Sequence, residues 1–180
     1  MKKLFPVAIL ALAMILASCD YHGSMISKIE DNEKALSADS TAMPPADKVK
    51  AMQALYLEFA DKYPNDSISP EYIFRAADLS IFLRDYKTTI GLYDRILTEH
   101  KSYAKLPQAL FMKAFVYDQY IQDPMQASEF YRQFLRLYPD HELADDATQA
   151  LLFCGKSDAE IMQILQQRAT EDSTSTKATR

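Results

Sequence analysis

Glycine is scarce in this sequence. The chain contains only three glycines among its 180 residues, and they are scattered at positions 23, 91 and 155. A phosphate-binding loop needs clustered glycines, because the backbone amides must approach the phosphate closely. The scattered glycines therefore exclude a loop of that kind. The body of the chain also lacks any alternating β-branched run of the sort that predicts a strand.

Histidine and cysteine are few and widely separated. His22, His100 and His141 are far apart, and none lies three or four residues from a cysteine or a second histidine. A structural zinc site needs such spacing, so we expect no metal and no cofactor. Cys154 follows Leu151-Leu152-Phe153, which predicts a buried small hydrophobic residue. The alternative is a nucleophilic thiol paired with a distant histidine, but no surrounding motif supports it.

Positive charge is in deficit. Lysine and arginine number 20 against 25 aspartate and glutamate residues, which gives a net charge of −5. An acidic chain without basic runs is a poor binder of nucleic acid. The charge would also not draw the chain to an anionic lipid surface. We therefore expect no nucleic-acid partner, and any membrane attachment has to come from another source.

The N-terminus carries the one long uncharged apolar run. Lys2 and Lys3 precede fifteen uncharged residues, from Leu4 to Ser18. This run is shorter than the roughly twenty residues that a helix needs to cross a bilayer. Lysines, a short apolar run and then small residues predict a secretory signal peptide over residues 1–18.

Leu16-Ala17-Ser18-Cys19 resembles the bacterial lipobox. The resemblance implies cleavage before Cys19, diacylglycerol on its sulfur and usually a third acyl chain on the new amino terminus. Several acyl chains anchor a protein stably. We therefore expect a lipoprotein of the cell envelope at the outer membrane, facing the periplasm. The inner membrane stays open, because Asp20 resembles the retention signal of enterobacteria, and that rule does not hold in all bacteria.

Residues 19–46 are polar and end in a pair of prolines. Ser27 and Glu30 have the spacing of a capping box, which favours a helix start. The apolar residues around them form only a thin stripe. A short helix over about residues 24–36 and a disordered tether both remain open.

One apolar pattern recurs through the body of the chain. Residues 130–139 repeat the pattern of residues 92–101, 38 positions earlier, and of residues 55–64, 75 positions earlier. Each copy has apolar residues at i, i+1, i+4 and i+5, which lie on one side of a helix. Two of the three copies end at Tyr-Pro, where proline stops the helix. A repeat of this length indicates stacked helical hairpins.

Apolar periodicity and prolines in first turns predict a series of helices joined by short connections. Gly155 suits a helix C-terminus, and Ser157 with Glu160 has capping-box spacing. The tail over residues 169–180 has no apolar residue to anchor it and is predicted to be disordered. The predicted helices span about residues 47–62, 70–83, 86–100, 104–121, 124–137, 141–153 and 157–168.

Two repeats in the body of the chain align at a shift of 38 residues, and in this alignment Ala76 in the first helix of one repeat corresponds to Ala114 in the first helix of the other. These features resemble the tetratricopeptide repeat, which has a small residue in its first helix. Its second helix carries an alanine, an aromatic residue and a closing proline. The resemblance implies an all-α fold over residues 47–168, a right-handed superhelical stack of antiparallel hairpins. The matching second-helix positions are Ala127, Tyr131 and Pro139.

Residues 131–141 also resemble the periplasmic lipoprotein type of this repeat. Examples are the lipoprotein subunit of the β-barrel assembly machine and the repeat domain of the protein that works with the Tol–Pal system. First helices line a concave surface in repeat folds of this kind, where an extended peptide or a helix can bind. The exposed residues predicted to line this groove are Glu71, Arg75, Asp78, Lys113, Asp118 and Gln119.

The expected function is that of a non-enzymatic, lipid-anchored adaptor that binds another envelope protein. The sequence offers no catalytic constellation, and no small-molecule substrate is evident. Two alternatives stay open. One is a structural lipoprotein that spaces the membrane from the cell wall. The other is an accessory subunit of an envelope enzyme or assembly machine.

Overall fold

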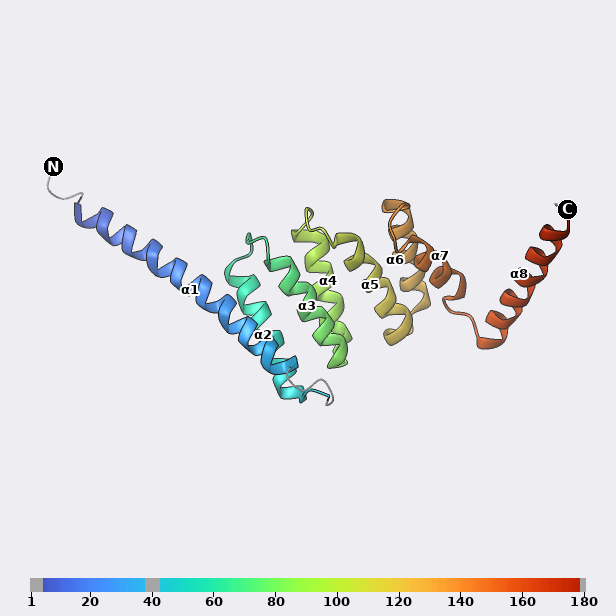
Figure 1. The fold of residues 1–180 in the computed structure, drawn as a ribbon, viewed down its shortest axis with the longest axis horizontal. Coiled ribbons are helices and arrows are strands. Elements are labelled where there is room, and N and C mark those ends of the chain that lie inside the picture. The colour runs from blue at the N-terminus through green and yellow to red at the C-terminus, as the bar shows by residue number, and fades with distance from the viewer. Residues whose placement is uncertain (1–4, 38–42, 179–180) are drawn as a thin grey trace. The chain divides into compact units, whose positions relative to one another are not determined.

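A computed structural model describes the backbone of residues 5–37 and 43–178, and every regular element in this part of the chain is a helix (Figure 1). The fold is therefore all-α, as predicted. The chain divides into two compact units, Met1–Thr88 and Thr89–Arg180. The elements are α1 (Phe5–Ser37), α2 (Ala46–Lys62), α3 (Ser69–Phe82), α4 (Tyr86–Glu99), α5 (Leu106–Val116), the π-helix η1 (Tyr117–Ile121), α6 (Pro124–Leu137), α7 (Ala144–Phe153) and α8 (Asp158–Ala178).

The first unit is built by α1 against α2 and by α2 against α3. Met25 and Ile29 of α1 are buried, although few apolar residues surround them in the sequence. Between α2 and α3, the ring of Phe59 meets the ring of Tyr72 edge-on, with centroids 5.0 Å apart. Residues 24–36 are thus helical and docked. The spacing of Ser27 and Glu30 marks no helix start, because α1 runs through both residues.

The second unit packs α6 between α5 and α7. Its core is a cluster of fully or almost fully buried side chains in which small and large residues alternate across the helices. Small residues let helix backbones approach closely, and the aromatic rings then fill the remaining space. This packing explains why alanine and aromatic residues recur at fixed positions. The cluster consists of Leu110, Ala114, Ala127, Tyr131, Phe134 and Ala147.

Two connections share a backbone feature that the sequence did not predict. Arg84 and Gln122 stand 38 residues apart, and both have φ of 58°. This left-handed conformation is uncommon for residues other than glycine. Each is followed by an aspartate whose carboxylate accepts a hydrogen bond from a backbone amide three residues on. The Thr88 N to Asp85 Oδ1 distance is 3.2 Å, and the corresponding bond to Asp123 is 3.0 Å.

Gly155 ends the α7 segment, as predicted. Its φ is +73°, and a Cβ at this position would stand 2.8 Å from Pro124 Cβ. After it, the predicted capping box forms, since Glu160 Oε2 accepts from Ser157 N at 2.8 Å. The helix that follows, α8, continues to Ala178, where the sequence predicted disorder from residue 169.

Candidate functional site

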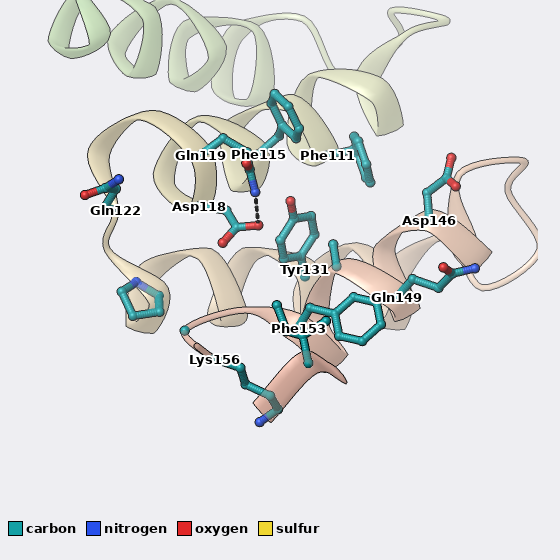
Figure 2. A pocket seen from close by; sticks show the side chains of 14 residues that line it. Phe111, Phe115, Asp118, Gln119, Gln122, Tyr131, Asp146, Gln149, Phe153 and Lys156 are labelled. Carbon is teal, nitrogen blue, oxygen red and sulfur yellow. Dashed lines mark hydrogen bonds between the residues drawn. The ribbon is translucent and has the colours of Figure 1, made fainter. Parts of the chain in front are cut away.

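The second unit contains an open pocket of about 690 Å³ (Figure 2). Residues of α5, η1, α6, α7 and the beginning of α8 line it. Phe111 and Phe115 lie one turn apart on α5 and form one wall. Phe153 and Ala150 of α7 contribute the facing apolar surface. A concave site with apolar walls and a few polar groups is the usual form of a ligand or peptide site.

Tyr131 lies at the centre of this pocket and comes from α6. Its side chain is fully buried, and its hydroxyl has no hydrogen-bond partner among the described residues. Burial raises the pKa of the Tyr131 hydroxyl, and the negative charge of the Asp118 carboxylate acts in the same direction. The hydroxyl therefore keeps its proton at neutral pH and can donate a hydrogen bond.

The rim of the pocket is polar. Of the residues predicted for a groove, Asp118 and Gln119 lie here. Gln119 Nε2 donates to Asp118 Oδ2 at 2.9 Å, which orients the carboxylate. Asp146 and Gln149 of α7 line the pocket on the side away from Asp118 in Figure 2. These α7 residues were absent from the sequence prediction, which considered only the first helices of two hairpins.

Lys113 was predicted to be exposed, and the structure shows otherwise. It is only 7% exposed, its Nζ lies 2.5 Å from Asp94 Oδ1, and the same nitrogen stands 3.9 Å from the centre of the Phe130 ring. The reason is helical geometry. Lys113 lies two residues from both Phe111 and Phe115, and two residues turn a helix by roughly 200°. Lys113 therefore points away from the pocket wall.

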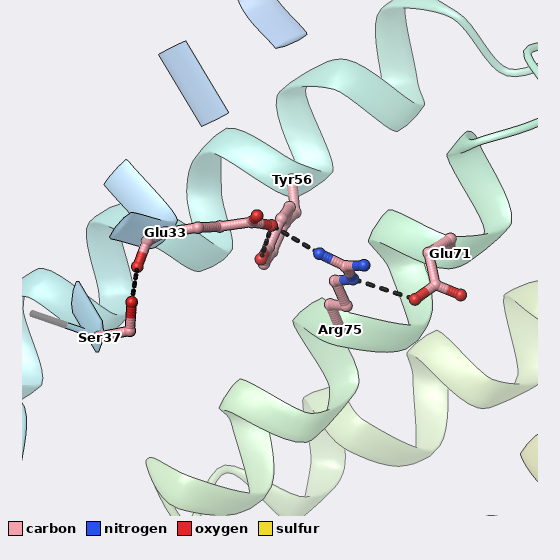
Figure 3. A network of polar contacts seen from close by, with 5 residues as sticks. All are labelled: Glu33, Ser37, Tyr56, Glu71 and Arg75. Carbon is pink, nitrogen blue, oxygen red and sulfur yellow. Dashed lines mark hydrogen bonds and ion pairs between the residues drawn. The ribbon is translucent and has the colours of Figure 1, made fainter. Parts of the chain in front are cut away.

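The predicted residues of α3 belong to the first unit and do not line this pocket. Arg75 Nη1 lies 2.7 Å from Glu33 Oε1, and Arg75 Nε lies 3.0 Å from Glu71 Oε1 (Figure 3). Tyr56 donates to the same oxygen of Glu33 at 2.6 Å. This network joins α1, α2 and α3, so Glu71 and Arg75 contribute to holding α1 in place. Asp78 is exposed on the same helix.

The lipidation candidate Cys19 falls within α1, but its side chain lies outside the described residues. The residues that follow are held firmly. His22 Nε2 lies 2.8 Å from Asp66 Oδ2, and the His22 ring contacts the Tyr63 ring edge-on with centroids 4.7 Å apart. Over the described residues, no helix has the length and apolar character needed to cross a membrane.

Cys154 is partly buried beside the core cluster, close to its predicted role as a small hydrophobic residue. Its Sγ lies 3.4 Å from the Pro124 carbonyl oxygen and donates to it. Burial raises the pKa of the Cys154 thiol. Because the thiolate is the reactive form, this environment disfavours a nucleophilic role. Within the described residues, no three potential metal ligands lie together.

The pocket could not be found from one helix at a time, since its walls come from helices that are adjacent only after folding. The available signal was a tyrosine, whose hydroxyl needs a partner, at a repeat position that also holds Tyr56 and Tyr93. Comparison with known proteins assigns neither the repeat nor the pocket. No protein-family model matches the sequence, and no curated protein matches it.

Proposed function

We propose that this protein is a non-enzymatic adaptor of the bacterial cell envelope, held to the membrane by lipid on Cys19, and that it binds another envelope protein. The observation that carries the proposal is the open apolar pocket of about 690 Å³ with the unpartnered hydroxyl of Tyr131 at its centre. Such a surface suits a partner that brings both apolar area and hydrogen-bonding groups.

The proposal includes a tetratricopeptide-like stack of hairpins in a right-handed superhelix. Support comes from burial at the aligned positions. Ala76 and Ala114 are fully buried, and so are Tyr93 and Tyr131, the aromatic residues 38 positions apart. The turns at Arg84 and Gln122 repeat at the same interval. Repeat proteins of this kind bind partners through surfaces formed by neighbouring repeats.

Anchoring is tested by the intact mass of the mature protein. The expected protein begins at Cys19 and carries the mass of its acyl chains. The variant Cys19→Ala should lose both the acyl mass and the cleavage. If the mature wild-type protein lacks the mass of acyl chains, the proposed lipid anchor on Cys19 is wrong.

Partner binding is tested by site-specific photo-cross-linking in native envelopes. A cross-linking amino acid replaces Gln149, which is exposed at the rim of the pocket. The matched control replaces Arg132, which is exposed on α6 and does not line the pocket. We expect a discrete protein adduct from position 149 and none from position 132. Absence of a protein adduct at 149 would contradict the proposal, and an adduct with peptidoglycan alone would favour a structural spacer.

A further inference from the structure

The pocket of the second unit has features that restrict what can enter it. Its apolar walls include three phenylalanine rings, Phe111, Phe115 and Phe153. Phe111 already meets Tyr131 edge-on, with ring centroids 5.7 Å apart. Aromatic rings favour such edge-to-face and offset contacts. A volume of about 690 Å³ leaves room for an aromatic side chain together with a short length of backbone.

The Tyr131 hydroxyl adds a requirement for a hydrogen-bond acceptor. It is buried and has no partner among the described residues. The Asp118 carboxylate lies near enough to raise the pKa of this hydroxyl, but no contact of hydrogen-bond length joins the two groups. An occupant with a carbonyl oxygen beside its apolar group would satisfy the hydroxyl. A peptide has a carbonyl next to every side chain, whereas a fatty acyl chain has none along its length.

Charge and amide groups at the rim complete the description. Asp118 and Asp146 lie on different sides of Tyr131 in Figure 2. Lys156 also lines the pocket, below Phe153 in Figure 2 and away from both carboxylates. The two carboxylates outnumber this one ammonium group, so the rim favours basic residues on either side of the inserted ring. The side-chain amides of Gln122 and Gln149 also line the pocket, and each offers donors and an acceptor for a peptide backbone.

We propose that the pocket accepts an internal, extended segment of the partner protein, with an aromatic side chain between the three phenylalanine rings and lysine or arginine on both sides of it. Tyr131 donates its hydroxyl proton to a backbone carbonyl oxygen of that segment. Asp118 and Asp146 face the flanking basic residues. This inference rests on the proposed adaptor function, because it names the chemistry of the partner at the same site.

The test is a titration of the full-length protein in zwitterionic phosphatidylcholine nanodiscs. The probe is an end-blocked pentapeptide, Lys-Gly-(4-fluoro)Phe-Gly-Lys, whose fluorine resonance reports entry of the ring into the pocket. A second peptide has glutamate in place of both lysines. Empty nanodiscs give the background. We expect the lysine peptide to bind saturably and the glutamate peptide to bind roughly tenfold more weakly or not at all, with a difference that shrinks at high salt.

Tyr131→Phe removes the hydroxyl and keeps the ring. The matched control is Tyr138→Phe, the same change at the residue that caps the C-terminus of α6, outside the pocket lining. Tyr131→Phe should lower the affinity for the lysine peptide about tenfold, since one hydrogen bond is lost, and Tyr138→Phe should leave that affinity unchanged. Protein stability should not fall in Tyr131→Phe, because the hydroxyl has no partner to lose.

Each contrary result overturns the inference. Equal affinity of the two peptides would remove the role of the carboxylates. Equal affinity of wild type and Tyr131→Phe would mean that the hydroxyl does not bind the peptide. A loss of stability in that variant would mean that the hydroxyl serves the fold. Uptake of oleic acid with exclusion of the peptide would make the pocket a lipid site. If position 149 cross-links to a protein but the peptide does not bind, the partner chemistry is wrong and the adaptor function stands.

Discussion

Phe134 offers the most direct measurement of how the second unit is held together. Its side chain is fully buried in the cluster that joins α5, α6 and α7. Its ring centroid lies 5.7 Å from the rings of Phe111 and Tyr138 and 5.6 Å from the ring of His141. Phe134→Ala would remove the ring from all three contacts and leave a cavity between helices that cannot collapse fully.

The expected cost is about 3–5 kcal/mol, because the lost transfer free energy and the cavity add to one another. A domain has a total stability of about 5–15 kcal/mol, so this one change removes a large share of it. The control is Arg132→Ala, two residues away on the exposed face of the same helix. That change should cost less than about 0.5 kcal/mol.

Native-state hydrogen exchange on the full chain separates the two units. Protection of the α6 amides should fall about a hundredfold or more in Phe134→Ala, since each 1.4 kcal/mol is a factor of about ten. Protection of α2 and α3 in the first unit should change far less, because repeat proteins transmit damage mainly to neighbours. If Arg132→Ala proves as costly as Phe134→Ala, the inward face of α6 has been assigned wrongly.

Two further predictions concern charged groups. Asp94→Ala leaves the buried Lys113 without its partner at 2.5 Å and should lower the free energy of unfolding, measured by urea denaturation, by about 1.5–3 kcal/mol. The double variant with Lys113→Met should recover part of this loss, because the unpaired buried charge is then removed. Equal losses in the single and double variants would contradict this. The pKa of Asp66 lies below its ordinary value, chiefly because the Ile68 amide donates to its carboxylate, with His22 contributing. A lowered acid pKa stabilises the fold fully above the unfolded pKa and is lost as pH falls through the folded pKa. Circular dichroism should thus show the first unit weakening below about pH 4, and Asp66→Asn should flatten that dependence.

Much of the helical framework was predictable because local signals agree with the fold. The apolar period of 3.6 residues and the prolines at first turns place most helix ends within a few residues of those observed. Pro124 begins α6, and the preceding Asp123 caps it as its side chain accepts from Gln126 N. These features act over one or two turns of chain, so a sequence displays them directly.

Burial and the pocket were harder to predict because they depend on neighbouring helices. Lys113 looked like a surface residue, but its long side chain reaches Asp94 while its stem is buried. Met25 and Ile29 are too few to predict docking of α1, yet both are buried. The α7 side of the pocket, including Phe153, has no local pattern that indicates a site.

Docking of residues 21–37 changes what a lipid on Cys19 would do. Cys19 precedes His22 by three residues in α1, which is roughly 4.5 Å along a helix axis. His22 is held 2.8 Å from Asp66, and Lys62 Nζ stands 3.3 Å from the centre of the Tyr21 ring. A flexible tether over residues 20–45 would have a root-mean-square end-to-end distance of about 28 Å, which would separate the rest of the protein from the lipid by that distance. The docked helix would instead hold the connection between α2 and α3 close to the membrane surface.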